Sequence, residues 1–350
     1  MNRNDDTLVI LTPGFAESEA DINCLPMQQS LVRTIKQHHP SLKIVVLSFQ
    51  YPYFKNEYNW HGINVIPFAG RNKGGFARLL LRRQVLQVLE KINRSGQIIG
   101  LLSFWYNECA WVGNKFAGRH GLKHYCWLLG QDAREGNKHV KHIKPEGGEL
   151  IALSDFIQDE FERNYGIRPL HMIPPGVETI PLNTDRNKRD INILGAGSLI
   201  PLKQYNVFIE VIAGLKEQRP DIRAFIAGDG PEREKLQALI STYGLTGNIV
   251  LTGELPHDEL LRVMQQTTIF IHPSSYEGFG MVCLEALQAG AQVISFCRPM
   301  KQSVDQWHIV AGKDEMIQKA KELLKKEEYR QVVPFTIDDT VKKMMALYNE

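Results

Sequence analysis

The chain has 350 residues, 43% of them hydrophobic and 23% charged, which is the composition of an ordinary globular protein with room for two domains. No apolar run reaches the ~18 residues of a membrane-spanning helix, and the first residues give no expectation of a secretory signal. The net charge is +2 and the five cysteines are scattered, so we expect a reduced, cytoplasmic protein with no zinc site and no nucleic-acid partner.

The first half of the chain alternates short apolar runs with helical patterns, which predicts a parallel sheet flanked by helices. The apolar runs predict strands at 7–11, 42–49, 63–68, 97–104, 124–129, 150–153 and 171–173. The helical patterns lie at 20–39, 75–93 and 155–165. We therefore expect a Rossmann-like N-terminal domain over residues 1–180.

A Pro-Pro-Gly turn at 174–176 and a polar linker at 183–190 precede a second alternation of the same kind. Strands are predicted at 191–194, 222–226, 249–251, 269–271 and 292–295. Helices are predicted at 205–218, 232–243, 258–266, 281–289 and 315–324, and a last one at 341–348 with Thr336 as N-cap. The predicted fold class is α/β, with a second Rossmann-like domain at 181–334 and a C-terminal helix within 335–350.

The most informative stretch runs from Phe270 to Gly290 and predicts a strand, a loop and a helix. Glu277 lies in the loop and Glu285 in the helix, so both can face the region beyond the carboxyl end of the strand, where open α/β sheets bind ligands. The backbone at Gly278, Phe279 and Gly280 can approach a phosphate at the helix start. For the two glutamates alone, ordinary surface carboxylates beside a Gly-rich turn are the simpler interpretation.

The ordered pattern Pro-Ser-x-x-Glu-Gly-Phe-Gly-x-x-x-x-Glu-Ala-x-x-x-Gly resembles the nucleotide-sugar motif of the retaining glycosyltransferases of family 4. The resemblance spans nearly the whole chain and is strongest at 191–295. It implies the GT-B architecture, in which two Rossmann-like domains face each other across a cleft. It also implies an acceptor-side first domain, on which the last helix packs back.

The same resemblance implies transfer of a sugar from a nucleoside-diphosphate sugar to an acceptor hydroxyl with retained configuration. The acceptor would be a carbohydrate or glycolipid of cell-surface polysaccharide or glycolipid synthesis. No cofactor is expected, because the nucleotide sugar is itself the co-substrate. Glu285 would bind the ribose hydroxyls, and Glu277 with the backbone at 278–280 would hold the donor sugar.

The turn after the strand at 191–194 contains Gly197 and Ser198, and its Gly-Ser-Leu-x-Pro-x-Lys-Gln resembles the family's Gly-Arg-Leu-x-x-x-Lys-Gly. Lys203 then takes the role of the lysine that stabilises the leaving diphosphate. The chain departs from the pattern at Ser198, where the family has arginine, and Arg298 is a candidate substitute. A dehydrogenase is disfavoured, because the third glycine of a dinucleotide fingerprint is missing.

Three further glycine turns are candidate donor-binding loops. Gly14, after the first strand, would offer backbone N–H groups to the donor phosphates. Gly228 and Asp229 lie in a turn that the family places near the base and ribose, although a purely structural turn is the alternative. Pro231 in this turn is expected at the first position of the next helix. The loop that contains Gly253 follows a strand whose end commonly contacts the nucleobase in the family.

On the acceptor side, the segment Leu129-Gly130-Gln131-Asp132 resembles the family's His-Gly-x-Asp. The family histidine is replaced by Leu129, so Gln131 and Asp132 are the polar groups left to bind acceptor hydroxyls. A helix N-cap is the structural alternative for Asp132. We expect a metal-independent reaction, because the chain has no Asp-x-Asp motif and His139-x-x-His142 lacks further ligands.

The segment 74–92 is basic and partly amphipathic, and residues 1–180 carry 21 Lys and Arg against 17 Asp and Glu. It is either the solvated face of a packed helix or a peripheral contact with the anionic inner face of a membrane. Two other readings of the whole chain stay open: a nucleotide-sugar epimerase or sugar phosphorylase of the same fold, and a non-catalytic nucleotide-sugar-binding partner subunit.

Overall fold

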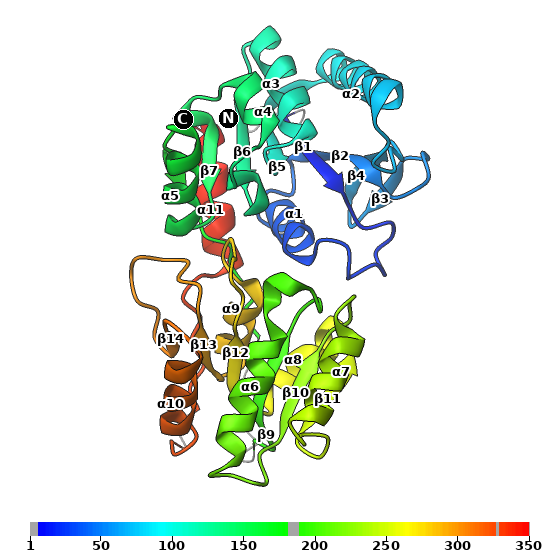
Figure 1. The fold of residues 1–350 in the computed structure, drawn as a ribbon. Coiled ribbons are helices and arrows are strands. Elements are labelled where there is room, and N and C mark those ends of the chain that lie inside the picture. The colour runs from blue at the N-terminus through cyan, green and yellow to red at the C-terminus, as the bar shows by residue number, and fades with distance from the viewer. Residues whose placement is uncertain (1–5, 181–188, 327–328, 350) are drawn as a thin grey trace. The chain divides into compact units, whose positions relative to one another are not determined.

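The structure is a computed structural model that describes residues 6–180, 189–326 and 329–349, and the chain divides into two compact units (Figure 1). The first unit contains Met1–Gly176 and Ile337–Glu350, and the second contains Val177–Thr336. Val177 N–H donates to Phe335 O at 3.1 Å, so the two ends of the second unit, near Val177 and Thr336, are paired with each other. The divisions therefore fall a few residues from the predicted 180/181 and 334/335. Within the predicted linker, 183–188 lies outside the described residues.

The first unit is built on an eight-stranded sheet of order β3-β4-β2-β1-β5-β6-β7-β8. All neighbouring strands are parallel except β3 and β4. Leu8–Leu11 of the central β1 are fully buried, as expected for a parallel sheet covered on both faces. The strands are β1 (Asp6–Gly14), β2 (Lys43–Tyr51), β3 (Tyr58–Trp60), β4 (Ile63–Pro67), β5 (Gln97–Phe104), β6 (His124–Leu128), β7 (Leu150–Ala152) and β8 (His171–Met172).

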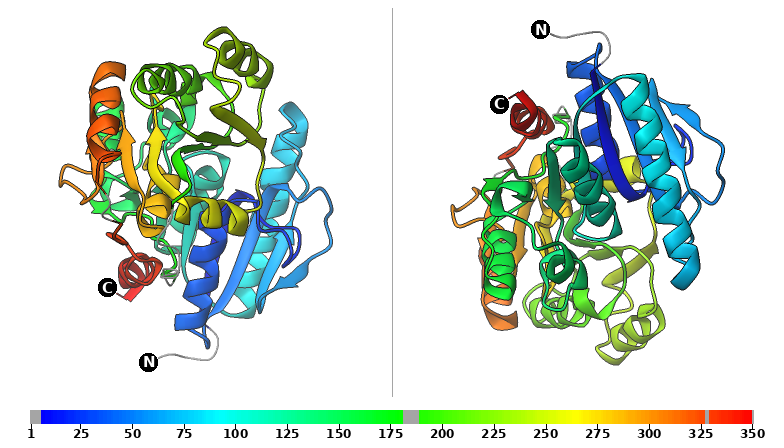
Figure 2. Two further views of the ribbon diagram at one scale, coloured as in Figure 1. Left: turned by 90° about the horizontal axis from the view of Figure 1, so that it is seen from below. Right: turned by 90° about the horizontal axis from the view of Figure 1, so that it is seen from above.

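Helices cover this sheet on both faces. The first unit contains α1 (Pro26–His38), α2 (Gly75–Ser95), α3 (Glu108–His120), α4 (Lys138–Ile143), α5 (Asp155–Tyr165) and α11 (Ile337–Asn349), with 3-10 turns η1 (Gln131–Ala133) and η2 (Gly147–Glu149). Leu81, Val85 and Leu89 of α2 join a core shared with α3, β1 and β2. The C-terminal α11 lies beside α1 (Figure 2), and Tyr348 Oη donates to Leu101 O at 2.9 Å.

The helix predicted from Ala20 is wrong in its first turn, because α1 begins at Pro26. The carboxylate of Asp21 accepts hydrogen bonds from the backbone N–H groups of Glu17, Asn23 and Cys24 at 3.1–3.2 Å. An aspartate that binds nearby backbone groups stabilises a loop at the expense of a helix. The residues before Pro26 therefore form a loop at the carboxyl end of β1.

The second unit has a six-stranded, fully parallel sheet of order β11-β10-β9-β12-β13-β14. Its strands are β9 (Ile191–Ala196), β10 (Ala224–Ala227), β11 (Ile249–Gly253), β12 (Thr267–His272), β13 (Gln292–Ser295) and β14 (Trp307–Ile309). The order reverses between β9 and β12, which is the position where doubly wound sheets bind ligands. The predicted α/β class, with two sheets of mostly parallel strands, is confirmed.

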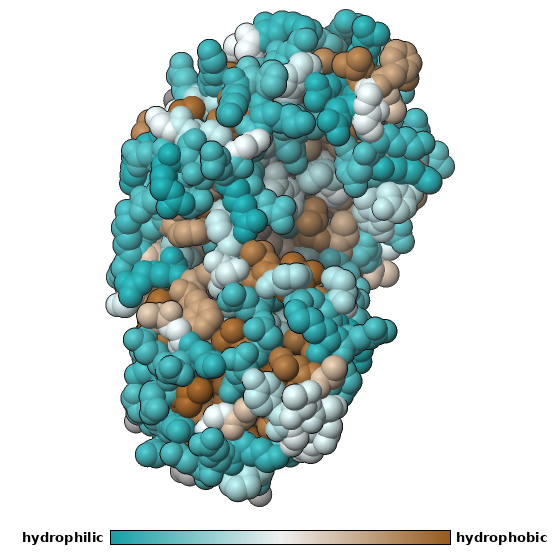
Figure 3. Space-filling view, in the orientation of Figure 1, coloured by the Kyte–Doolittle hydropathy of each residue, from teal (hydrophilic) through white to brown (hydrophobic). Residues whose placement is uncertain are grey.

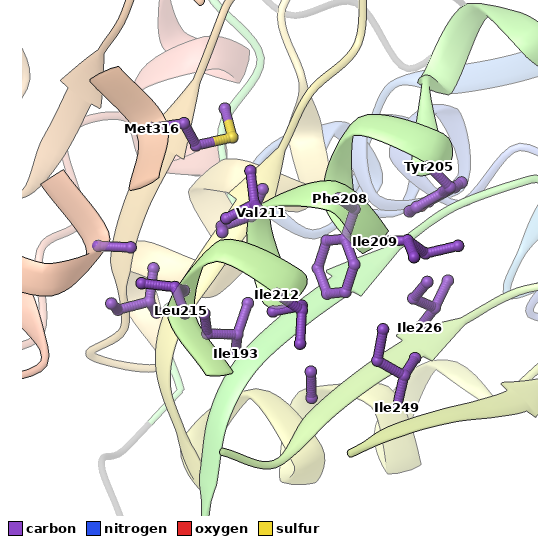
Figure 4. Close-up of a cluster of buried hydrophobic side chains, with 14 of the residues drawn as sticks. Ile193, Tyr205, Phe208, Ile209, Val211, Ile212, Leu215, Ile226, Ile249 and Met316 are labelled. Atoms are coloured by element: carbon purple, nitrogen blue, oxygen red, sulfur yellow. The ribbon is translucent and has the colours of Figure 1, made fainter. Parts of the chain in front are cut away.

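The helices of the second unit are η3 (Pro201–Lys203), α6 (Tyr205–Lys216), α7 (Arg233–Thr242), α8 (His257–Gln265), α9 (Met281–Gln288) and α10 (Lys313–Leu323). The core lies between α6 and the sheet, where Phe208 and Ile212 of α6 pack with Ile193 of β9 (Figure 4). α7 begins at Arg233, and not at Pro231 as predicted. Leu199 holds the intervening turn, because its N–H donates to Asp229 O at 2.9 Å and its O accepts from Glu232 N–H at 3.0 Å.

Candidate active site

The site is built on the loops that follow β9 and β12. These strands are parallel neighbours, with Phe270 opposite Leu194, so their carboxyl ends open on the same edge of the sheet. The backbone N–H and the Oγ of Ser275 donate to Leu202 O at 3.0 and 3.2 Å. These two hydrogen bonds join the loops and place Lys203 beside Glu277.

The carboxylate of Glu277 is held on one oxygen. Its Oε1 forms an ion pair with Lys203 Nζ and accepts from His272 Nε2 at 3.0 Å and from Ser274 Oγ at 3.4 Å. A carboxylate accepts, so Nε2 of the buried His272 carries the proton. Within the part of the chain that the structure describes, Oε2 of Glu277 has no hydrogen-bond partner. This second oxygen is therefore the one that remains to accept a hydrogen bond from a ligand.

The surroundings of Glu277 favour its ionised form. Burial alone raises the pKa of Glu277, but the hydrogen bond from His272 and the charge of Lys203 outweigh it and lower this pKa to about 2. The resulting stabilisation is present above the ordinary carboxyl pKa of 4.5 and is lost as the pH falls towards 2. Burial lowers the pKa of His272, so its ring is neutral at pH 7.

Glu285 lies further along α9 and has a different partner. Its Oε1 is 3.0 Å from Nε2 of His257, the first residue of α8. Burial raises the pKa of the Cys283 thiol well above its ordinary value, and the nearby charges of Glu277 and Glu285 add to this effect. Both carboxylates thus lie around the first turns of α9, although only Glu277 contacts Lys203.

We expect His257 to titrate above its ordinary pKa of 6.5, because the hydrogen bond to Glu285 raises the pKa against the opposing effect of burial. The contribution of this pair to stability is full below pH 6.5 and is lost as the pH rises through the folded-state pKa. Histidine titration by NMR should show the raised pKa, and Glu285→Gln should abolish the rise. An unchanged His257 titration in that variant would contradict the assignment.

Three glycine turns lie side by side at the same edge of the sheet. Gly197 N–H donates to Ala227 O at 2.9 Å, and Gly228 N–H donates to Gly253 O at 2.8 Å. Gly228 has φ +145°, and a Cβ on it would lie 2.0 Å from Gly197 O. Only glycine fits there, so the predicted turns of Gly197, Gly228 and Gly253 form one backbone surface.

Two predicted donor-binding side chains, Asp229 and Ser198, lie beside this surface, and their binding role stays a prediction. Asp229 Oδ2 lies 3.6 Å from Arg233 Nη1, a partner that the sequence analysis missed. Ser198 is exposed, and the structure pairs neither it nor Arg298 with Glu277 or Lys203 among the residues it describes. Arg298 is exposed in the loop after β13, and its role as a substitute cation for the donor phosphates stays a prediction.

The start of α9 is formed by glycine and anchored by Phe279. The Phe279 side chain is buried, with ring centroids 6.2 Å from Trp307 and 5.6 Å from Phe335, so only its backbone can contact a ligand. Gly280 takes φ +88° as the N-cap residue, and no side chain caps the helix. An uncapped helix N-terminus favours a negatively charged ligand group.

In the first unit, the structure changes the interpretation of Asp132. Its buried carboxylate accepts from the backbone N–H groups of Tyr106 at 2.9 Å, Leu129 at 3.1 Å and Gly130 at 2.8 Å. The prediction that it binds an acceptor hydroxyl does not fit this placement, because backbone groups already saturate the carboxylate. Gln131 beside it is exposed and remains a candidate for acceptor binding.

Gly14 is the last residue of β1 and not part of a turn, because β1 extends beyond the predicted Leu11. A Cβ on it would meet Tyr51 Cβ at an ordinary 3.7 Å, so sterics do not require glycine there. Besides Arg233 and His257, the sequence patterns did not select His272, whose ring holds Glu277. Its signal was its position at the last residue of β12, directly before the Pro-Ser of the quoted pattern.

No group of three His, Cys, Asp or Glu side chains in the described ranges 6–180, 189–326 and 329–349 is arranged to hold a metal ion. His142 belongs to the His139-x-x-His142 pair considered above as metal ligands, and its Nδ1 lies 2.5 Å from Lys138 O of the same helix, within hydrogen-bond distance. Within the same ranges, none of the helices is both long and apolar enough to cross a membrane.

Comparison with known proteins agrees with this geometry. Residues 177–333 match the sequence profile of the family described as glycosyl transferases group 1, and this range is nearly that of the second unit. The whole chain also has the fold of solved GT-B glycosyltransferases. A glycosyltransferase from Rickettsia africae superposes with a TM-score of 0.72 at 14% identity, covering 98% of both chains. The pneumococcal O-GlcNAc transferase GtfA, solved with UDP and GlcNAc, gives 0.67 at 11% identity over 99% of both.

Curated relatives match part of the chain. The phosphatidylinositol N-acetylglucosaminyltransferase gpi3 subunit of Schizosaccharomyces pombe is 38% identical over 164 residues, which are 45% of this chain and 36% of that protein. The 2-deoxystreptamine glucosyltransferase of Streptomyces kanamyceticus is 28% identical over 143 residues, 39% of this chain and 37% of that protein. The matched region of this chain therefore covers little more than a third of the length of each of these two relatives.

Proposed function

We propose that this protein is a retaining glycosyltransferase of family 4 that moves a hexosyl group from a nucleoside-diphosphate sugar to an acceptor hydroxyl without a metal ion. The observation that carries the proposal is the pairing of Lys203 with Glu277. It lies at the point where the strand order of the second sheet reverses, within the residues that match glycosyl transferases group 1.

Each group at the site has a role in this reaction. Glu277 Oε2 accepts a hydrogen bond from a hydroxyl of the donor sugar, while His272 and Ser274 hold Oε1. Lys203 and the uncapped start of α9 stabilise the negative charge that develops on the leaving diphosphate. Glu285 binds the ribose. The departing diphosphate accepts the proton of the acceptor hydroxyl, so no protein base is needed.

The ligands and names of similar proteins suggest which donors and acceptors to test first. Several solved glycosyltransferases of this fold contain UDP, among them a complex of Anabaena HepE with UDP and glucose. A further relative is named D-inositol 3-phosphate glycosyltransferase. We infer a UDP-sugar donor and a polyol or glycolipid acceptor of cell-surface polysaccharide or glycolipid synthesis. The protein would work in the cytoplasm, with the nucleotide sugar as co-substrate in place of a cofactor.

The proposal is tested by incubating the purified protein with a panel of nucleoside-diphosphate sugars. Calorimetric binding of one donor, slow hydrolysis of that donor and transfer to an added acceptor are the expected results, with retained configuration by NMR. Activity unchanged by a metal chelator is also expected. Epimerisation of the donor without any acceptor would instead identify an epimerase, and phosphate-dependent cleavage a phosphorylase. Absence of binding to every donor would refute the donor site.

One observation favours a second candidate, a non-catalytic subunit that binds a nucleotide sugar. Ser198 is exposed where the family has arginine, and the structure supplies no other cation to Glu277 than Lys203 among the described residues. Donor binding without turnover, unchanged by Glu277→Ala, would select this candidate. Turnover that is lost in Glu277→Ala would exclude it.

We also infer that the first unit contacts an anionic membrane surface through the start of α2. Phe76, Leu79 and Leu80 are 71%, 54% and 41% exposed, and apolar residues are visible over α2 in Figure 3. Basic side chains surround them: Arg71, Lys73 and Arg83 are all exposed. Exposed apolar side chains within a basic surface favour the interface of a bilayer that contains anionic lipid.

Replacing Phe76 and Leu79 together by serine should lower the fraction of protein that sediments with vesicles of phosphatidylcholine and phosphatidylglycerol by about tenfold. The reason is the loss of two side chains that enter the bilayer interface. Leu170→Ser is the matched control, because Leu170 is 69% exposed elsewhere on the first unit. Equal sedimentation of both variants would contradict this contact.

A further inference from the structure

A second cluster of charged and aromatic side chains lies between α2 and α3, on a face of α2 other than the one that carries Phe76 and Leu79. Arg78 and Arg82 are four residues apart on α2, and Glu108, Trp111 and Lys115 recur at helical spacing on α3. Because Glu108 is the first residue of α3 and Gln50 is the last residue but one of β2, the cluster borders the carboxyl edge of the first sheet.

Glu108 fixes the cluster. Arg82 Nε donates to Glu108 Oε1 at 2.7 Å, and Arg78 Nε lies 3.8 Å from the same oxygen. Gln50 Nε2 donates to Glu108 Oε2 at 3.3 Å, while its Oε1 accepts from Asn72 N–H at 2.8 Å. Both oxygens of the carboxylate are thus occupied, and the end of β2 and the loop after β4 are tied to the start of α3.

Trp111 holds two cations in place. The guanidinium carbon of Arg82 lies 4.4 Å from the centroid of the Trp111 ring, and Lys115 Nζ lies 5.0 Å from it. Arg82 therefore donates a hydrogen bond from Nε to Glu108, and one face of its guanidinium packs on the Trp111 ring. In the part of the chain that the structure describes, its two Nη groups have no hydrogen-bond partner.

The cluster carries more positive than negative charge. Arg78 and Arg82 lie beside the single carboxylate of Glu108, Lys115 adds a third cation beside Trp111, and Arg78 is 45% exposed. The nearby His139 of α4 reports the same imbalance: burial lowers its pKa to about 4, and the charges of Arg82 and Arg78 contribute. An ordered guanidinium with unused donors, flanked by two further cations, has the geometry for the oxygens of a phosphate.

We propose that the α2–α3 cluster is a phosphate-binding site, with Arg82 and Arg78 as the principal ligands and Lys115 as a third cation. Since the first unit is the expected acceptor side, and resting on the proposed function, the bound group would be a phosphomonoester or phosphodiester of the acceptor. The same chemistry is offered by a soluble phosphorylated acceptor and by a phospholipid headgroup.

The test measures binding alone, with no nucleotide sugar present, so its result does not depend on the proposed transfer reaction. Inorganic phosphate is titrated into the full chain by calorimetry at constant ionic strength, and vesicles of phosphatidylcholine with phosphatidylglycerol are used in a second arm. The variants are Arg82→Gln and Arg78→Gln. Arg94→Gln is the control, because Arg94 is an exposed arginine in the last turn of α2 with no partner among the described residues.

We expect Arg82→Gln and Arg78→Gln each to weaken binding by about tenfold or more, and Arg94→Gln by less than about twofold. A specific loss with inorganic phosphate identifies a soluble phosphate as a ligand, and a specific loss with vesicles alone identifies the headgroup. Arg78→Gln is the safer variant for folding, because Arg78 lies 3.8 Å from Glu108 whereas Arg82 donates to it at 2.7 Å. Binding that is absent in both arms, or reduced equally by Arg94→Gln, would overturn the proposal.

Discussion

Replacing Lys203 by methionine is expected to lower kcat for donor cleavage by about 10²–10³-fold and to weaken binding of the nucleoside diphosphate. Among the described residues, Lys203 is the only positively charged side chain that forms an ion pair with Glu277. The removal of one group that stabilises developing negative charge costs about 3–4 kcal/mol of transition-state stabilisation. Initial rates of donor hydrolysis and calorimetry with UDP would measure the two effects separately.

Two controls make this prediction specific. Lys235→Met removes an exposed lysine whose Nζ pairs with Glu232 at 2.7 Å on α7, and it should leave kcat within about twofold. Lys203→Arg keeps the charge and should recover part of the rate. Wild-type kinetics in Lys203→Met, with an unchanged melting temperature, would remove Lys203 from the active site.

The second large effect is expected from Gly228→Ala. A Cβ at this position would lie 2.0 Å from the backbone oxygen of Gly197, and φ is +145°, so the turns after β9 and β10 must separate. Steric overlap with backbone and the strained dihedral together should lower the free energy of unfolding by about 3–5 kcal/mol. The urea midpoint followed by fluorescence would show it, together with weakened UDP binding.

Gly118→Ala provides the matched comparison for Gly228→Ala. Gly118 lies within α3, and a Cβ there would meet no atom within 4 Å. Alanine in a helix interior should be neutral or stabilising by up to about 1 kcal/mol. If both variants unfolded at the wild-type midpoint, the close contact between the Gly197 and Gly228 turns would be wrong.

The fold was largely predictable because buried parallel strands leave continuous apolar runs. The strand at 97–104 and the helix at 155–165 have the bounds that the sequence predicted. The elements that were not predicted include the helix α3 (Glu108–His120) and two strands of three residues each, β3 and β14. Long-range contacts decide such strands, since β3 exists only through its pairing with β4.

The site was predictable only in part, because the spacing of residues along the chain does not reveal which distant residues come into contact in the fold. The quoted patterns selected Lys203 and Glu277, which the structure places in contact. They did not select His272, whose role depends on a buried ring that reaches a loop five residues later. The resemblance to His-Gly-x-Asp suggests an acceptor role for Asp132, but an aspartate in a loop has the same sequence signature whether it binds a ligand or backbone N–H groups, as it does here.

The carboxylate of Asp132 ties together the segments that follow β5 and β6, since its partners are Tyr106 on one side and Leu129 and Gly130 on the other. Asn137 adds to this tie, because its Nδ2 donates to Tyr106 O at 2.7 Å and to Asp132 O at 3.1 Å. Gln131 stands outside that framework. Under the proposed function, substitutions of this exposed side chain are expected to change the acceptor preference while the scaffold beneath it stays intact.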